Sequence, residues 1–375
     1  MKKIISLALV LSVFASAFCV RADNFSVSAK AAIVVNGETG AVIFSQNENE
    51  RLPMASTTKI MTALLLCENC DLDETVVTTR EMVTVEGSSM GLLEGDTVSF
   101  KALLYGMMLP SGNDAATTTA IALAGSLEGF ALMMNKKAAE IGMENTNFVT
   151  PSGLDADMHY TTAADMAKLS VYAMKNDIFR KAVSTKSISV EYGNPPYRRT
   201  LTGHNKMLDL YDGAVGIKTG YTSKSGKCLV SAAERKGKKV IAVTLCDSAT
   251  WNNHALLLDL GFSRLADKSL ELPREFSKIE VISGESKYAR LRCEKSVVSL
   301  TADETERLSY KIAIKDFIYA PAKRGDKVGT VCFYIGETPI RELDITVSDT
   351  VDIKKTPNIG FREKYFQYLI KLLSV

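Results

Sequence analysis

Residues 56–67 read STTKIMTALLLC, and this stretch decides how the surrounding chain is organised. It contains no proline or glycine, it is rich in strong helix formers, and apolar residues fall on most of its helical faces. We therefore expect a buried helix at the centre of a domain. Ser56 and Lys59 stand at positions i and i+3 on one face of that helix, so the Lys59 amine can reach the Ser56 hydroxyl.

This pair has the composition of an activated nucleophile. A serine hydroxyl reacts slowly until a neighbouring base takes its proton, and a lysine can be that base when burial or another cation lowers its pKa. Ser56-Thr57-Thr58-Lys59 is the only Ser-x-x-Lys in the chain. The pattern also arises by chance in many helices, so further motifs are needed before it indicates chemistry.

Strand and helix patterns on both sides of this stretch indicate one mixed domain. The run AAIVVNGETGAVIF at 31–44 places two apolar segments around a turn, which is typical of a β-hairpin. Helical patterns follow, and strands return much later, so sequence-distant strands bracket a helical block. The expected helices are 101–109, 113–124, 127–141, 161–175 and 251–265, and the expected strands are 213–222, 227–234 and 238–246.

A second candidate motif is Ser111-Gly112-Asn113, which follows Pro110 between two helical patterns. A loop fixed by proline and glycine can present a hydroxyl and a carboxamide to a cleft. Either polar residue could instead simply cap the next helix. The same Ser-x-Asn spacing occurs at Ser45-Gln46-Asn47, which follows the first hairpin and precedes the helix at 56–67. Because of these positions in the chain, we favour Ser111 and Asn113.

A third candidate motif is Lys218-Thr219-Gly220, at the end of the strand pattern AVGIKTGYT. A strand that borders a cleft can offer its backbone to an extended peptide, and a glycine lets the ligand approach closely. Lys224-Ser225-Gly226 has the same pattern six residues later, in an expected hairpin turn. We favour Lys218, because a rigid strand positions a side chain better than a turn.

The two ends of the chain carry their own signals. Residues 1–22 have two lysines, an apolar run of about 15 residues and small residues, which is typical of a secretory signal peptide. Residues 354–375 have a side-chain charge of +4. On a helical wheel, their aromatic and leucine residues oppose an arc with Glu363, Lys364, Gln367 and Lys371. We expect an in-plane helix on an anionic membrane surface, at the outer face of the cytoplasmic membrane, or else a helix packed on the protein body.

The length of the chain and a change in its apolar pattern indicate two folded domains. A chain of 375 residues is longer than a single hydrophobic core usually supports. Beyond Pro273 the sequence changes to short alternating apolar segments with regular turns, which predict a small β-sandwich. The expected division is a signal peptide at 1–22, a catalytic domain at 23–270, a β-sandwich at 271–353 and a terminal helix at 354–375.

Charge and composition exclude several functions. Without residues 1–22 the chain has 42 basic and 43 acidic residues, so nucleic-acid binding has no electrostatic support. Three histidines, none at ligand spacing to another, argue against a zinc hydrolase, and we expect no metal or cofactor. Cys67 and Cys70 form a C-x-x-C, which we interpret as partly buried thiols near a helix end. Cys228 and Cys246 are expected to face each other across a hairpin, as thiols or a disulfide.

In this order, the three motifs resemble those of penicillin-binding proteins and serine β-lactamases. The Ser-Gly-Asn form, GLDADMHYTTAADMAKL at 153–169, GIKTGYTSKSGKCL at 216–229 and the β-rich C-terminal segment are similar to low-molecular-mass D-Ala-D-Ala carboxypeptidases. The resemblance implies an α+β catalytic domain, with an antiparallel sheet flanked by helices and a helical lobe. It also implies a β-sandwich domain and a terminal amphipathic helix.

The same resemblance assigns roles to individual residues. It implies that Ser56 forms the acyl-enzyme, Lys59 is the general base and Ser111 relays a proton to the leaving group. Asn113, Lys218, Thr219, Gly220 and Tyr221 would bind the substrate, the last as a backbone oxyanion donor together with Ser56. Tyr221 departs from many relatives, which carry histidine there. The implied substrates are peptidoglycan stem peptides, with β-lactams as covalent inhibitors.

Two other functions share parts of this pattern. A serine β-lactamase has the same motifs, but it needs a carboxylate that activates water, for which Glu140 and Glu144 are candidates. A non-catalytic wall-binding protein could retain the cleft without the chemistry. The Ser-Gly-Asn motif and the β-rich domain favour the carboxypeptidase over the first, and the complete set of hydrolytic residues favours it over the second.

Overall fold

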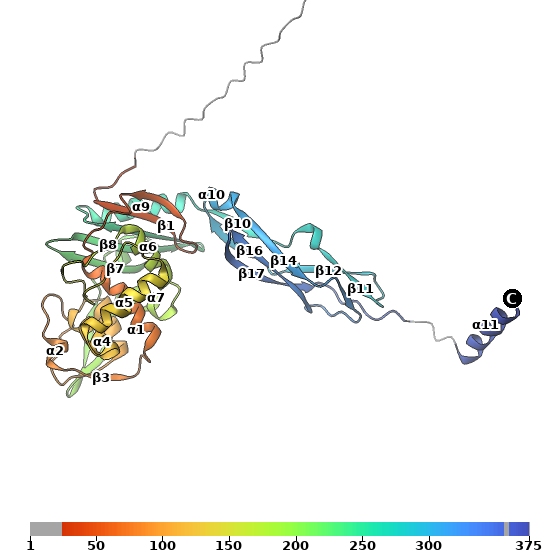
Figure 1. Cartoon of the computed structure of the whole chain (residues 1–375), viewed down its shortest axis with the longest axis horizontal. Helices are drawn as coiled ribbons and strands as arrows, with labels where there is room; N and C mark the ends of the chain where they lie inside the picture. The colour runs from red at the N-terminus through yellow and green to blue at the C-terminus, as the bar shows by residue number, and fades with distance from the viewer. Residues whose placement is uncertain (1–24, 356–359, 375) are drawn as a thin grey trace, which may run out of the picture.

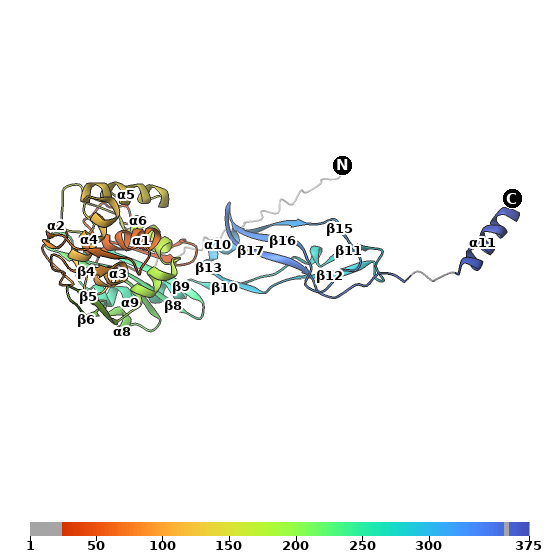
Figure 2. The same ribbon diagram turned by 90° about the horizontal axis from the view of Figure 1, so that it is seen from below.

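The computed structural model describes residues 25–355 and 360–374. The expected signal peptide at 1–22 lies outside the described residues. Figure 1 shows a mixed helix–sheet unit, followed by an elongated β-rich unit and a final helix. Figure 2 shows the same order of units from a second direction.

A five-stranded antiparallel sheet forms the centre of the first unit, in the order β2-β1-β9-β8-β7. The expected hairpin and late strands are confirmed. Alternate residues of β1 enter two different cores: Ile33 and Val35 face the helical block, and Ala32 and Val34 face α9. Because both faces are covered, all six residues of β1 are buried. The strands are β1 (Ala31–Asn36), β2 (Val42–Gln46), β7 (Ala214–Thr222), β8 (Gly226–Arg235) and β9 (Lys238–Leu245), and α9 spans Thr250–Ser263.

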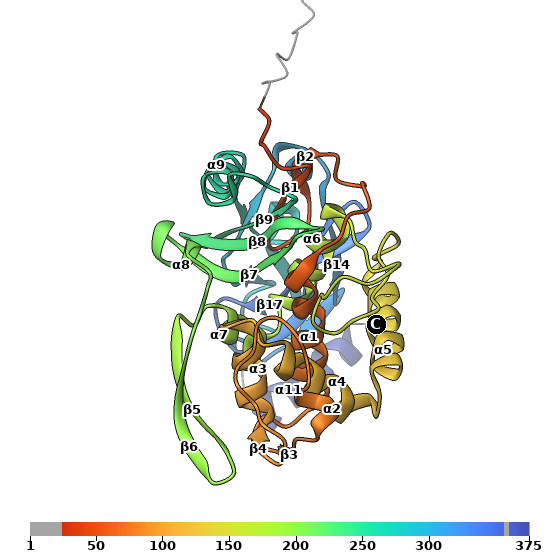
Figure 3. The ribbon, with the colours of Figure 1, turned by 90° about the vertical axis from the view of Figure 1, so that its left-hand side faces the viewer.

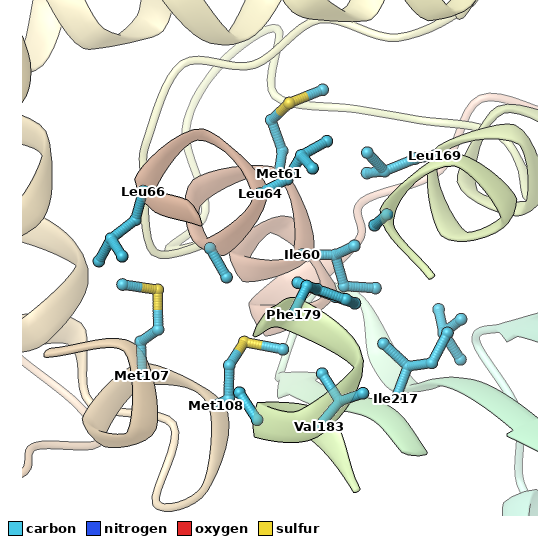
Figure 4. Close-up of a cluster of buried hydrophobic side chains, with 14 of the residues drawn as sticks. Ile60, Met61, Leu64, Leu66, Met107, Met108, Leu169, Phe179, Val183 and Ile217 are labelled. Atoms are coloured by element: carbon cyan, nitrogen blue, oxygen red, sulfur yellow. The ribbon is translucent and has the colours of Figure 1, made fainter. Parts of the chain in front are cut away.

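Helix α1 (Lys59–Asn69) lies in the middle of the helical block. Figure 4 shows Ile60, Met61 and Leu64 of α1 among side chains from the neighbouring helices and from Ile217 of β7. Every residue of α1 from Lys59 to Cys67 is buried, as its apolar sequence predicts. The other helices are α2 (Arg80–Val83), α3 (Phe100–Met108), α4 (Asn113–Ala124), α5 (Leu127–Ile141), α6 (Ala163–Ala173), α7 (Asp177–Val183) and α8 (Met207–Leu210).

A second sheet was not expected from the sequence. It has the order β3-β4-β5-β6, and its β5–β6 hairpin projects from the unit in Figure 3. Along β5 the apolar residues Ile188, Val190 and Tyr192 alternate with polar ones, and Val190 and Tyr192 are buried, whereas most of β6 is exposed. Its strands are β3 (Thr75–Val77), β4 (Thr97–Ser99), β5 (Ser187–Gly193) and β6 (Pro196–Thr202).

Two local expectations need correction. Ser56 does not lie in the α-helix but in the short 3-10 helix Ala55–Thr58 that leads into α1. Cys228 does not face Cys246, because the turn between β8 and β9 has two residues, both with positive φ, and pairs Arg235 with Lys238. This register places Cys228 opposite residue 245. The six cysteines among the described residues are free, and Cys67 is buried while Cys70 is half-buried, as expected for these two thiols.

The C-terminal unit is a β-sandwich with its own core. A six-stranded sheet, β14-β16-β17-β12-β11-β15, packs against the pair β10–β13. Thus β10, which precedes the expected boundary at 270, pairs within this unit. The strands are β10 (Ala266–Leu270), β11 (Lys278–Ile282), β12 (Tyr288–Cys293), β13 (Ser296–Leu300), β14 (Leu308–Ile314), β15 (Phe317–Tyr319), β16 (Lys327–Ile335) and β17 (Thr338–Val347), with a 3-10 helix Arg274–Phe276 and α10 (Ala302–Glu306).

Helix α11 (Phe361–Leu373) follows the sandwich and extends beyond its far end in Figures 1 and 2. Its residues 362–373 are exposed, including Phe366 at 67% and Leu373 at 82%. In the described chain no single helix is long and apolar enough to cross a membrane. The bent pair α4–α5, at 86°, meets the length and composition criteria together, but the first eight residues of α4 are buried within the fold.

Candidate active site

Ser56 and Lys59 meet at the start of α1, as predicted. Lys59 Nζ lies 2.9 Å from Ser56 Oγ, 2.7 Å from the carboxamide oxygen of Asn113 and 2.7 Å from the carbonyl oxygen of Ser152. The Lys59 side chain is fully buried. The residue before Ser56, Ala55, has φ +47°, a left-handed conformation that a non-glycine residue adopts only at a cost.

The environment of Lys59 favours the unprotonated amine. Burial lowers the pKa of Lys59 well below its usual value, the charge of Lys218 lowers it further, and the Asp114 carboxylate raises it. A neutral amine has two N–H donors and one lone pair. Because the oxygens of Asn113 and Ser152 accept the two hydrogens, the lone pair is left for the Ser56 hydroxyl. This arrangement can remove the proton of Ser56.

The Ser111-Gly112-Asn113 loop lies beside this pair. Ser111 is buried, has φ +65° and lines the cavity at Ser56. The Asn113 side chain donates to the carbonyl of Glu86 at 2.7 Å while it accepts from Lys59. Asn113 therefore holds the base in place, a contact that the motif alone did not reveal.

Strand β7 brings the third motif to the same place. It is the edge strand of the central sheet, so one side of its backbone is free to pair with an extended ligand. Lys218 is buried, and burial lowers its pKa to about 7. Thr219 and Gly220 line the cavity with Tyr221, whose side chain is 67% exposed.

Two glycines allow the backbone around Ser56 to pack this closely. A Cβ on Gly220 would lie 3.0 Å from the backbone nitrogen of Ser56, so β7 can approach the nucleophile only without a side chain there. A Cβ on Gly153 would lie 1.9 Å from the carbonyl oxygen of Ala55. Gly153 has φ +88° and follows Ser152, whose carbonyl binds Lys59.

A cavity of about 480 Å³ connects the three motifs. Several lining residues were not predicted, since each is a single residue in an ordinary segment and only the fold brings it here. Burial and the charge of Lys218 lower the pKa of one of them, His204. The cavity is lined by Ser56, Ser88, Ser111, His204, Thr219, Gly220, Tyr221, Lys227, Cys228, Thr250 and Trp251. A larger cavity of about 650 Å³, between the catalytic sheet and the sandwich, contains none of the motif residues.

The competing motifs lie elsewhere. Ser45 is an exposed residue of strand β2, and Lys224 lies in the turn between β7 and β8. Glu140 forms an ion pair with Lys137 on α5, and Glu144 is exposed. Neither glutamate lines the cavity at Ser56, so neither is placed to activate a water molecule there.

Comparison with known proteins places this site in a family. Residues 17–249 match the family described as D-alanyl-D-alanine carboxypeptidase, and residues 269–352 match the family described as penicillin-binding protein 5, C-terminal domain. The chain is 31% identical to D-alanyl-D-alanine carboxypeptidase DacF of Bacillus subtilis, over 94% of this chain and 93% of the relative. It is 31% identical to DacC of Escherichia coli, over 87% and 85%.

Solved structures agree with these matches. The Streptomyces K15 DD-transpeptidase has a TM-score of 0.61 at 31% identity, and the match covers 64% of this chain and 98% of that one. The carboxypeptidase DacD of Francisella tularensis has a TM-score of 0.64 at 24% identity, over 89% and 96%, and this likeness shows the fold, sandwich included. The expected fold class and family are confirmed, and the chain belongs to the D-alanyl-D-alanine carboxypeptidase family of serine peptidases.

Proposed function

We propose that this chain removes the terminal D-alanine from peptidoglycan stem peptides through an acyl-enzyme on Ser56. Lys59 takes the hydroxyl proton as Ser56 Oγ attacks the carbonyl carbon of the penultimate D-alanine. The backbone N–H groups of Ser56 and Tyr221 stabilise the oxyanion. Ser111 passes a proton to the departing amine, the C–N bond breaks, and water then hydrolyses the ester.

The contact that carries this proposal is the one between Lys59 and Ser56. A buried lysine amine 2.9 Å from a serine hydroxyl, with both of its remaining hydrogens directed to oxygen acceptors, has the hydrogen-bonding pattern of a general base. A structural lysine would instead pair with a carboxylate, and none contacts its Nζ among the described residues.

Strand β7 supports a free peptide end as the substrate. An extended peptide can pair with its open edge, which directs the terminal carboxylate to Thr219 and Lys218. Because a carboxylate stabilises a nearby ammonium, the bound substrate would favour the charged form of Lys218, whose pKa is near 7 without it. A β-lactam presents the same carboxylate next to a reactive amide and would acylate Ser56.

Release of D-alanine from a pentapeptide tests the activity directly. We expect Ser56→Ala and Lys59→Met to abolish release and Ser111→Ala to reduce it strongly. Ser45→Ala, at an exposed position of the competing Ser-x-Asn, is the matched control and should keep wild-type activity. An active Ser56→Ala protein would refute the assignment of the nucleophile.

Intact mass spectrometry with penicillin separates the carboxypeptidase from a β-lactamase. We expect an adduct on the wild-type protein that persists long after excess penicillin is removed, because no carboxylate among the described residues lines the cavity to activate water. The adduct should be absent from Ser56→Ala. Loss of the adduct within seconds would instead favour the β-lactamase.

We further propose that the protein is exported and that α11 holds it on the outer face of the cytoplasmic membrane. Exposed Phe366, Leu369 and Leu373 would enter the interface of an anionic bilayer, while Lys364 and Lys371 on the polar arc face the lipid headgroups. Phe366→Glu is expected to weaken binding to vesicles that contain phosphatidylglycerol, and Gln367→Glu, with the same charge change on the polar arc, much less. Equal binding of both variants would contradict this orientation.

A further inference from the structure

The carboxylate of Asp114 is buried beneath a loop that borders the active site. We call residues 86–92 the clamp loop. Asp114 accepts hydrogen bonds from the backbone N–H groups of Met90, Gly91 and Leu92, at 2.9–3.1 Å, and from the hydroxyl of Ser89 at 2.6 Å. Its side chain is 1% exposed. One carboxylate thus accepts from three consecutive N–H groups that have no strand or helix to bind them, and Gly91 N–H also donates to the Ser89 hydroxyl at 2.8 Å.

The β5–β6 hairpin holds the same loop from the opposite side. The Tyr192 hydroxyl donates to the carbonyl of Met90 at 2.5 Å, and the Arg199 guanidinium donates to the carbonyl of Gly91 at 2.6 Å. Arg199 lies 4.0 Å from the ring centres of both Tyr192 and Tyr197, so its side chain is held in place by two aromatic faces. The N–H and C=O groups of both Met90 and Gly91 are therefore bound.

The clamp loop in turn contacts the catalytic machinery. Its Ser88 carbonyl accepts from the backbone N–H of Asn113 at 2.6 Å, and its Glu86 carbonyl accepts from the Asn113 carboxamide at 2.7 Å. Asn113 binds Lys59 through its other carboxamide atom. Ser88 itself lines the cavity. A continuous set of hydrogen bonds therefore runs from Asp114 through the loop to the base.

We propose that Asp114 is a positioning residue for acylation, which fixes the clamp loop and thereby the Asn113 side chain that orients Lys59, with Arg199 holding the loop from outside. The inference rests on the proposed function of Ser56 and Lys59. Asp114 touches neither the substrate nor the reacting atoms; it acts through Asn113. No signal in the sequence distinguished it, because it follows the Ser-Gly-Asn motif as an ordinary first-turn acid of α4.

The charge of Asp114 gives a second, separable effect. Among the described residues, two charged groups act on Lys59: Lys218 on β7 lowers its pKa, and Asp114 on α4 raises it. Asp114→Asn removes the raising influence, so the pKa of Lys59 should fall. The acid limb of the acylation rate should then move to lower pH, even as disorder of the loop lowers the maximum rate. Arg199→Ala disturbs the loop without removing that carboxylate.

The experiment measures the second-order rate constant of acylation by a fluorescent penicillin as a function of pH, together with thermal unfolding, on the full chain. We expect Asp114→Asn to lower the maximum by about 100-fold, as a displacement of about 1 Å can do, and to shift the acid limb to lower pH. Arg199→Ala should lower the maximum with the limb unmoved. The control for Asp114→Asn is Asp165→Asn, another buried acid in the first turn of a helix, α6. The control for Arg199→Ala is Arg198→Ala, the exposed neighbour of Arg199 on the hairpin.

The outcomes distinguish the possible failures. Wild-type rates in Asp114→Asn, or a loss equal to that of Asp165→Asn with no shift of the limb, would overturn the inference. If Asp114→Asn does not fold, Arg199→Ala decides: equal rates for Arg199→Ala and Arg198→Ala would overturn it. Failure of the wild-type protein to react with penicillin or to release D-alanine would instead refute the proposed function itself.

Discussion

Replacement of Gly153 by alanine tests how closely the active-site loops are packed. The added Cβ would lie 1.9 Å from the Ala55 carbonyl oxygen and 2.9 Å from the Ser56 nitrogen, whereas ordinary contacts begin at 3.4 Å. The two segments must therefore separate by about 1.5 Å to restore an ordinary contact. Either Ser56 moves away from Lys59, or Ser152 withdraws the carbonyl that binds the Lys59 amine. We expect acylation by labelled penicillin to slow by about 100-fold or more.

A matched control separates this displacement from backbone strain. Gly142 has φ +81°, close to the +88° of Gly153, but a Cβ there would meet nothing within 4 Å. Both alanine variants should lose roughly 1–2 kcal/mol of unfolding free energy from the left-handed conformation, and Gly142→Ala should keep the wild-type acylation rate. If Gly153→Ala is acylated as fast as Gly142→Ala while both remain folded, the packing argument is wrong.

Three further predictions follow from individual side chains. Lys218→Gln removes a charge that lowers the pKa of Lys59, so the acid limb of acylation should move to higher pH, opposite to the shift expected for Asp114→Asn. Burial lowers the pKa of His254 from 6.5 to about 3, so the unfolded chain binds more protons below pH 6.5. Unfolding free energy should therefore fall by up to ~1.4 kcal/mol per pH unit on acidification, and urea titrations of His254→Gln should show a shallower fall. The six cysteines at and beyond residue 67 should all be alkylated after denaturation without reductant, and a disulfide-linked peptide would contradict the free thiols.

The fold was largely predictable where burial leaves a periodic pattern. The helices α3 to α6 and the strands β7 to β9 have their expected positions within a few residues, because each buries an apolar face or two. The β5–β6 hairpin was missed although Ile188, Val190 and Tyr192 alternate along β5, because most of β6 is exposed and has no comparable run of apolar residues. The register of β8 and β9 was predicted wrongly by one residue. Lys236 adopts a left-handed conformation and forms a two-residue turn with Gly237, and a lysine at this position does not predict such a turn.

For the active site, the motif residues were predictable from the sequence, but their supporting contacts were not. The three motifs identified the residues that meet at Ser56, because a hydroxyl, an amine and a strand edge have recognisable local patterns. The supporting contacts could not be read from the sequence, since they join residues far apart in the chain. The carbonyl of Ser152, 93 positions from Lys59, accepts one hydrogen of the base, and Trp251 lines the cavity from α9.

The basicity of Lys59 depends both on the fold and on the contacts within the site. The same apolar residues that make α1 a buried helix remove Lys59 from water, and that burial is the largest cause of its lowered pKa. A neutral amine is useful only if its lone pair faces the hydroxyl, and this requires two acceptors at fixed places. Asn113 supplies one from the start of α4, and Ser152 supplies the other from a loop. The sequence of one helix therefore sets the protonation state of the base, while residues distant in the chain set its direction.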